Sequence, residues 1–195
     1  MRDGEGGLIL ASASPRRGEL LARAGYRFVV APPEVEEWEE GTYPFRELCG
    51  ANAALKARAV AAAHGEAVVL AADTMVALEG RVLGKPRDLG EARRMLERLS
   101  GRVHEVCTAV CIRRGADRRL FHEVSRVRFR ELGPDTIREY TRRVCVLDKA
   151  GAYAVQEDGG MLVAEIEGSY ENVMGLPIEQ VAAELARFGV QPEKP

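Results

Sequence analysis

Two consecutive arginines at the start of an expected helix are the first residues whose chemistry stands out. In residues 11–25, "ASASPRRGELLARAG", Ser14 and Pro15 have the types favoured at a helix N-cap and first position. Arg16 and Arg17 then fall where the helix dipole disfavours cations, by about 0.3 to 1 kcal/mol each. A bound phosphate at the helix start would turn this repulsion into attraction.

Two interpretations of the arginine pair are open at this point. Free backbone amides and the hydroxyls of Ser12 or Ser14 could complete a phosphate site at the helix start. Alternatively, both arginines point away from the helix start and pair with surface acids such as Glu34 or Glu36. The residue types alone favour the two interpretations about equally.

An acidic residue interrupts the most apolar segment of the chain. Residues 67–80, "AVVLAADTMVALEG", begin as a continuous apolar run, which is typical of a strand buried on both faces. We expect that strand to end at Asp73, and open α/β sheets bind ligands at such strand ends. The carboxylate could ligate a divalent cation or deprotonate a water molecule. Capping a turn through Thr74 is the simpler alternative.

Lysine is rare among the basic residues, which are nearly all arginine. A retained lysine therefore suggests a place where a compact ammonium suits better than a guanidinium. Lys85 lies in a turn between a glycine and a proline, and Lys149 follows Asp148. Lys56 lies on an alanine-rich helix, where an exposed surface residue is the alternative. Together the three lysines would supply point charges for a polyphosphate.

A cluster of glutamates follows the second expected strand. By default such a cluster is a solvated surface, although one member directed inward could join Asp73 around Mg²⁺, which prefers carboxylate, phosphate and water oxygens. Spacing alone does not select that member. The cluster comprises Glu34, Glu36, Glu37, Glu39 and Glu40.

Composition limits the function classes. The chain has 195 residues, 46% of them hydrophobic and 30% charged, with a net charge of -2, as expected for a globular protein with a substantial core. This near-neutral charge favours neither a nucleic-acid partner nor a membrane surface. The N-terminal residues are polar and no apolar run is long enough for a membrane span, so we expect a cytoplasmic protein. The cysteines form no CxxC pair, so we expect neither a zinc site nor a disulfide framework.

Helix and strand patterns alternate along the chain, which predicts an α/β protein with a mixed sheet. We expect strands at 8–11, 26–31 and 67–73, a hairpin arm within 80–88, a long hairpin at 102–114 and 118–132, and a strand at 161–168. We expect helices at 15–24, 45–63, 89–100, 134–143 and 177–188.

The motifs, taken in order, resemble the Maf family of nucleoside triphosphate pyrophosphatases. They are "SASPRRGELL", "VEE", "AADTMV", "LGKPRD", "LSGRVHEVCTAV", "DKAGAYAVQ" and "GSYENVMGLP", and the similarity extends from Leu8 to Phe188. The resemblance implies an elongated, twisted mixed β-sheet flanked by helices, with two lobes and a central cleft, similar to inosine triphosphate pyrophosphatases. It implies one domain over residues 1–195, with flexible tails at 1–7 and 190–195.

The resemblance also implies an activity. Family members convert a nucleoside triphosphate into the monophosphate and pyrophosphate with a divalent metal cation such as Mg²⁺ or Mn²⁺, and are typically homodimers. The family has also been linked to cell-division arrest. The segment "DKAGAYAVQ" is similar to the branch acting on dTTP and UTP, with modified pyrimidine nucleotides such as 5-methyl-UTP as further candidates. That branch usually has Gly-Ile-Gln-Gly where this chain has Ala154, Val155, Gln156 and Glu157.

Residue roles follow from the resemblance position by position. Asp73 matches the catalytic proton acceptor. The positions associated with substrate selection are matched by Arg16, Thr74 and Gln156. Further pocket positions are matched by Ser12, Arg17, Glu37, Lys56 and Lys85. Of these, Glu37 would bind the metal together with Asp73.

The two lines of reasoning combine into one expected mechanism. The triphosphate is bound by the cations Arg16, Arg17, Lys56 and Lys85. A metal at Asp73 and Glu37 neutralises charge on the α-phosphoryl, and water activated by Asp73 attacks it. Gln156 and Thr74 would read the pyrimidine edge. The alternatives are a pyrophosphatase for inosine or xanthosine triphosphate and a regulatory protein that binds a nucleotide or a division partner without turnover.

Overall fold

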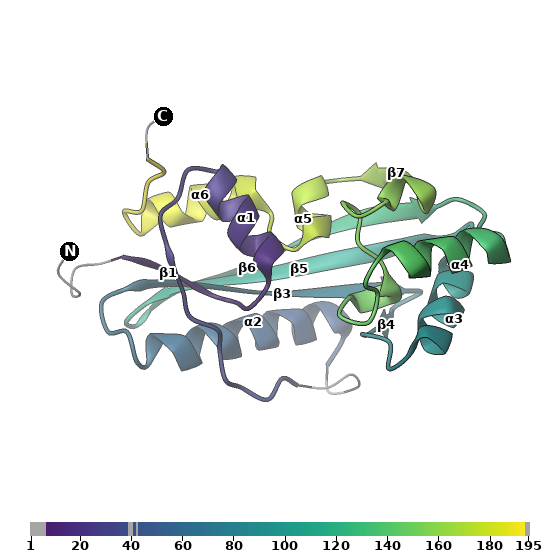
Figure 1. The fold of residues 1–195 in the computed structure, drawn as a ribbon. Helices are drawn as coiled ribbons and strands as arrows, with labels where there is room; N and C mark the ends of the chain where they lie inside the picture. Colours follow the sequence, from purple (N-terminus) through teal and green to yellow (C-terminus); the bar gives the residue numbers. More distant parts are fainter. Residues whose placement is uncertain (1–6, 39–40, 42, 194–195) are drawn as a thin grey trace. The chain divides into compact units, whose positions relative to one another are not determined.

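The computed structural model describes residues 7–38, 41 and 43–193 (Figure 1). In this part of the chain seven strands form one sheet in the order β2-β1-β3-β5-β6-β7, with β4 paired to β3. The strands are β1 (Leu8–Ala11), β2 (Val29–Val30), β3 (Val68–Leu78), β4 (Arg81–Leu83), β5 (Val103–Arg114), β6 (Asp117–Phe129) and β7 (Val163–Glu167). The α-helices are α1 (Pro15–Arg23), α2 (Phe45–Ala61), α3 (Leu89–Leu99), α4 (Pro134–Arg143), α5 (Tyr170–Met174) and α6 (Ile178–Arg187). Two short 3-10 helices are η1 (Ala150–Ala152) and η2 (Gly159–Met161).

The sheet is mixed, as predicted. Strand β1 pairs in parallel with β2 and with β3, whereas β4 is antiparallel to β3 and β7 is antiparallel to β6. Residue contacts divide the chain into two compact units. The first unit comprises residues 1–73, 108–123 and 175–195, and the second comprises residues 74–107 and 124–174. An α/β fold with helices flanking a mixed sheet is therefore confirmed.

In the first unit, helices cover both faces of the sheet. Figure 1 shows α1 and α6 on one face and α2 on the other. Helix α1 begins at Pro15, directly after Ser14, and ends ahead of Gly25, whose φ of 85° suits a glycine better than any other residue. Leu21 of α1 and Leu185 of α6 are fully buried. These observations confirm the expected helix after the first strand.

Helix α2 packs on the sheet through a stripe of buried residues at helical spacing. The stripe contains Leu48, Cys49, Asn52, Ala53, Lys56, Ala57 and Val60. Its two alanines are completely buried, which allows the helix backbone to lie close to the strands. The stripe also contains an amide and an ammonium, so this buried face brings polar groups to the sheet.

The second unit has its own apolar core, to which Leu96, Phe129, Tyr140 and Leu162 contribute fully buried side chains. Helix α3 packs against α4 and η1. It begins at Asp88, whose carboxylate accepts a hydrogen bond from the Glu91 N–H group at 2.7 Å. Capping of this kind stabilises a helix by about 1 kcal/mol.

Strand β3 differs from the expectation in a way that matters for the chemistry. It does not end at Asp73 but continues to Leu78, so both the strand-end position and the turn-capping alternative for Asp73 are wrong. The residues after Asp73 are mainly apolar, and they pair with β4 through Val76 opposite Leu83. Asp73 therefore lies within a continuous strand, and its carboxylate is buried there.

Other differences are smaller. The strand expected at 26–31 contains only Val29–Val30, and α5, η1 and η2 were not expected. Near the C-terminus, the Glu193 N–H group donates a hydrogen bond to the Gly25 carbonyl at 2.8 Å. No helix among the described residues is both long and apolar enough to cross a membrane.

Candidate active site

Lys56 and Asp73 form a buried ion pair in the first unit. The buried face of α2 presents Lys56 to β3, where its Nζ lies 2.7 Å from Asp73 Oδ1, and each side chain is only 9% exposed. The same ammonium lies 3.0 Å from Oε2 of Glu37, which is about half exposed. One cation therefore contacts both carboxylates predicted to serve a metal. A buried charge of either sign is tolerated only with a partner of this kind.

The second carboxylate oxygen of Asp73 differs from the first. Oδ2 is buried and has no hydrogen-bond partner among the described residues. A buried carboxylate oxygen without a partner is costly, and the cost is removed when it ligates a cation or accepts a proton from water. Asp73 thus has one oxygen held by Lys56 and one available for chemistry.

The donor set suits a hard divalent cation shared with a substrate. In the described part of the chain, no three His, Cys, Asp or Glu side chains gather closely enough to form a metal cage. Mg²⁺ commonly takes only one or two protein carboxylates and completes its shell with phosphate oxygens and water. Asp73, with its unpartnered Oδ2, and Glu37 fit that pattern.

Asn52 holds the acidic segment beside Lys56. It is 1% exposed, accepts a hydrogen bond from the Trp38 N–H group at 2.8 Å and donates one from Nδ2 to the Trp38 carbonyl at 3.2 Å. Glu37 is the adjacent residue, and Lys56 lies one turn further along α2. Among the described glutamates of the cluster, Glu37 forms the ion pair with Lys56, and Glu39 and Glu40 lie outside the described residues.

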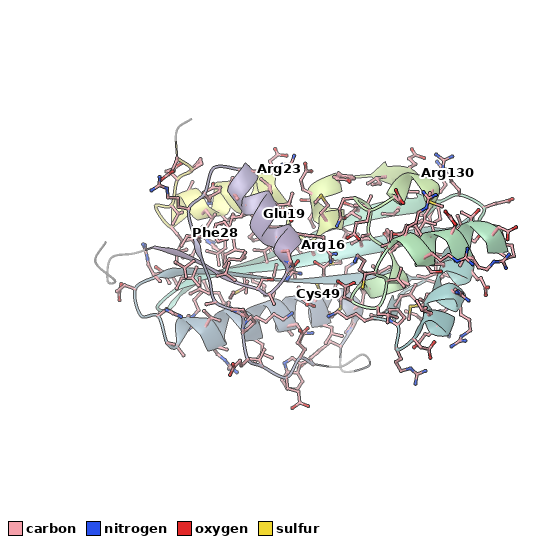
Figure 2. The ribbon with its side chains drawn as sticks, viewed as in Figure 1. Arg16, Glu19, Arg23, Phe28, Cys49 and Arg130 are labelled. Atoms are coloured by element: carbon pink, nitrogen blue, oxygen red, sulfur yellow. The ribbon has the colours of Figure 1, made fainter. Side chains whose placement is uncertain are left out.

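Asn52 and Cys49 are site residues that sequence reasoning missed. The Cys49 thiol, on α2 (Figure 2), donates a hydrogen bond to the main-chain carbonyl of Asp73 at 3.2 Å. Both residues fall on the same helical stripe as Lys56. The available signal was the spacing, because Asn52 precedes Lys56 by four positions in an otherwise alanine-rich helix.

Arg17 ties several segments of the first unit together. Its Nη1 donates to Ser12 Oγ at 3.1 Å and to the Ala72 carbonyl at 2.8 Å, and its Nε donates to the Gly175 carbonyl at 2.9 Å. Burial lowers the pKa of the Arg17 guanidinium, and the negative charge of Asp73 opposes that shift. The structure thus brings two predicted residues, Arg17 and Ser12, to the strand that carries Asp73.

Arg16 has a different environment at the same helix end. It is half-buried and forms no hydrogen bond or ion pair with any residue that the structure describes, so the expected alternative of pairing with Glu34 or Glu36 is not found. No side chain caps α1, and no acidic residue lies in its first turn. Figure 2 shows Arg16 at the start of α1 and Arg23 at its end. A helix start of this kind is electrostatically suited to bind an anion.

The remaining predicted residues belong to the second unit. Thr74 follows Asp73 on β3 and, by strand alternation, directs its side chain to the opposite face of the sheet. Lys85 is exposed in the turn after β4. The neighbouring Gly84 carbonyl accepts a hydrogen bond from the Gly151 N–H group at 3.1 Å, so this turn lies beside the segment that leads to Gln156.

Lys149 is buried in the second unit with acceptors on all sides. Its Nζ lies 2.6 Å from the Cys145 carbonyl, 2.9 Å from Asp148 Oδ1 and 3.4 Å from Glu157 Oε1. The first two contacts are hydrogen bonds, and the contact with Glu157 is an ion pair. These neighbours, together with the burial of the ammonium, argue against the hypothesis that Lys149 binds a polyphosphate.

The chain is similar to known proteins in both sequence and fold. The profile of the family described as Maf-like protein matches residues 7–188. A dTTP/UTP pyrophosphatase of Moorella thermoacetica is 50% identical over 186 residues, covering 94% of this chain and 95% of its own. Another from Akkermansia muciniphila is 49% identical over 174 residues, covering 89% and 92%. The structure of the Staphylococcus aureus Ham1 protein has a similar fold, with a TM-score of 0.53 at 16% identity, covering 93% of this chain and 98% of that one.

Proposed function

Because the chain belongs to the Maf family, we propose that it hydrolyses dTTP and UTP to the monophosphate and pyrophosphate. Relatives of 47–50% identity along most of the chain carry the name dTTP/UTP pyrophosphatase. The observation in this chain that best supports turnover is the buried Asp73 carboxylate, which has one oxygen bound to Lys56 and the other without a partner. A protein that only binds nucleotides has no need for such a group.

The proton chemistry is assigned to Asp73. Lys56 holds Oδ1 and fixes the orientation of the carboxylate, so Oδ2 is the atom that accepts a proton from the attacking water. Asp73 and Glu37 would hold Mg²⁺ or Mn²⁺, which when bound neutralises charge on the α-phosphoryl group. The hydrogen bonds between Asn52 and Trp38 keep Glu37 within reach of Lys56.

Phosphate binding is assigned to Ser12 and the cations Arg16, Arg17, Lys56 and Lys85. Arg16 supports this role most directly, because it has no described partner and stands at an uncapped helix start. Base recognition is assigned to Thr74 and Gln156, whose hydroxyl and amide groups can form hydrogen bonds with a pyrimidine edge.

Family membership also supports a cytoplasmic homodimer that acts on small nucleotides rather than on nucleic acid or membranes. Light scattering of the purified protein tests the dimer, with a mass near twice 21.3 kDa expected. A monomer mass would contradict this part of the proposal.

Product analysis across a panel of triphosphates tests the activity. With Mg²⁺ or Mn²⁺, we expect dTTP, UTP and 5-methyl-UTP to give the monophosphate and pyrophosphate in equal amounts. Release of inosine or xanthosine monophosphate as the main product would instead support a purine pyrophosphatase. Tight binding of UTP without any pyrophosphate release would support a regulatory nucleotide-binding protein.

A further inference from the structure

The segment that carries Gln156 is held rigidly in the second unit. The Tyr140 hydroxyl accepts a hydrogen bond from the Ala154 N–H group at 3.0 Å and donates one to the Ala154 carbonyl at 3.3 Å. The neighbouring Tyr153 hydroxyl lies 2.8 Å from Nε2 of the buried His104. Because the Ala154 main chain and the Tyr153 side chain are both held, the backbone before Gln156 has little freedom, and the orientation of the Gln156 amide depends on its own contacts.

Glu157 provides the described contact of that amide. Gln156 Nε2 donates to Glu157 Oε1 at 3.4 Å, and the same oxygen lies 3.4 Å from the ammonium of the buried Lys149. A carboxylate accepts hydrogen bonds but cannot donate them, so it attracts the NH₂ end of an amide and repels the carbonyl end. The Lys149 ammonium is itself held by hydrogen bonds to Cys145 and Asp148, so its ion pair with Glu157 favours one position of that carboxylate.

We propose that Glu157, held by Lys149, is a specificity-determining positioning residue, which fixes the Gln156 amide with Nε2 towards itself and Oε1 on the opposite side as an acceptor for the base. The inference rests on the proposed function, in which Gln156 reads the pyrimidine. It assigns a role to the position at which this chain departs from the usual Gly-Ile-Gln-Gly pattern of the branch it resembles.

The fixed amide would select the base through a single hydrogen-bond donor on the base. On the hydrogen-bonding edge of uracil and thymine the only donor is the N3–H group, and it lies between two carbonyl acceptors. Cytosine has an unprotonated acceptor at N3, which faces an amide oxygen unfavourably. A Gln156 side chain free to turn its amide over would accept either pattern, so removal of Glu157 should relax discrimination between UTP and CTP. Mismatched buried polar groups are the usual source of such discrimination.

The test compares kcat/KM for UTP and for CTP in the full-length protein. In Glu157→Ala, we expect the UTP to CTP ratio to fall by about tenfold, as expected for losing a hydrogen bond to a charged group. Glu157→Gln has nearly the same size and can donate as well as accept, so it should shift the ratio in the same direction and serves if the alanine variant does not fold. Glu167→Ala removes an exposed carboxylate paired with Arg126 in the same unit and should keep the wild-type ratio.

A double-mutant cycle identifies the route of the effect. If Glu157 acts through Gln156, adding Glu157→Ala to Gln156→Ala should leave the ratio where the single Gln156 substitution puts it. A wild-type enzyme that hydrolyses UTP, together with a Glu157→Ala ratio within about twofold of wild type, would overturn the role of Glu157. A further ratio change in the double variant would overturn the route through Gln156. Absence of UTP and dTTP hydrolysis by the wild-type protein would contradict the proposed function instead.

Discussion

The two units contain buried lysines in opposite situations. In the first unit, Lys56 bridges Glu37 and Asp73, and the far oxygen of Asp73 has no described partner. In the second unit, Lys149 forms two hydrogen bonds and an ion pair with Glu157. Both ammonium groups are desolvated, but only the first belongs to a cluster with polar atoms left over.

The different surroundings of Lys56 and Lys149 suggest different roles, with Lys56 serving the reaction and Lys149 positioning other side chains. A saturated network stabilises one arrangement of the chain, whereas an unsaturated one is destabilised until a ligand completes it. Arg16, at an uncapped helix start, adds a half-buried cation without a described partner to the first unit. We therefore expect substitutions of Asp73 and Arg16 in the first unit to affect turnover more than stability, and substitutions of the buried His104 and Tyr140 in the second unit to affect stability.

The largest expected effect is that of Asp73→Asn. Asparagine keeps the shape of the side chain but cannot accept the proton of the attacking water, so kcat should fall by about a thousandfold. Binding of a non-hydrolysable UTP analogue, followed by calorimetry, should remain measurable. Glu34→Gln neutralises an exposed acid of the same unit and should retain activity. Near wild-type turnover in the Asp73 variant would remove the contrast between the units.

A pH effect tests one of the buried polar atoms of the second unit that have no described hydrogen-bond partner. His104 is buried, its Nδ1 has no described partner, and burial lowers its pKa to about 4. Between pH 6.5 and 4 the unfolded chain therefore binds a proton that the folded chain does not, so stability falls as the pH falls. The loss should reach about 3 kcal/mol across that window.

Urea unfolding between pH 7 and 5 measures this effect, since most carboxylates stay ionised there. The free energy of unfolding of wild type should decrease more steeply with falling pH than that of His104→Gln. Equal slopes for the two proteins would show that His104 does not titrate as its burial requires.

The Tyr140→Phe substitution tests whether a buried hydrogen bond of the second unit contributes to stability. It leaves the buried N–H group of Ala154 without its acceptor, which should lower the free energy of unfolding by about 2 kcal/mol. Tyr170→Phe removes a hydroxyl from an exposed ring and should have no measurable effect in the same urea titration. Equal stability of both variants would contradict a stabilising role for the hydrogen bonds between the Tyr140 hydroxyl and Ala154.

The smallest effect is expected for Arg16→Ala. Loss of one charge-assisted contact with phosphate should raise KM by about tenfold. The unliganded protein should be as stable as wild type or slightly more so, because the helix dipole disfavours a cation there. Arg23→Ala, at the other end of α1, should instead lower stability slightly and leave KM unchanged. A clear stability loss in Arg16→Ala would indicate a structural partner.

Much of the fold and part of the site follow from local sequence patterns. The helix after "LILA", the long hairpin of β5 and β6 and the mixed sheet were all predictable, because periodicity and turn residues are local signals. The end of β3 was mispredicted, since one acidic residue normally interrupts a buried strand. Here Lys56, 17 positions earlier, compensates for its charge, and only the packing of α2 on the sheet makes that pairing possible.

Contacts between distant segments explain what the sequence does not reveal. The acidic segment that carries Glu37 is held by the hydrogen bonds between Asn52 and Trp38, and Lys149 donates to the main-chain carbonyl of Cys145. Main-chain acceptors carry no residue-type signal. The hydrogen bond from Arg17 to the Gly175 carbonyl, 158 positions away, is another contact with a main-chain acceptor.

That last contact has a consequence for how the protein is made. Gly175 leaves the ribosome 158 residues after Arg17, yet its carbonyl is one of the acceptors that hold the Arg17 guanidinium. The Ser12 and Ala72 acceptors are synthesised earlier, so the nascent β1–α1 segment has an incomplete set of contacts until residue 175 has emerged. Nascent chains arrested before residue 175 should accordingly be cleaved more readily within residues 12–25 than nascent chains in which residue 175 has emerged.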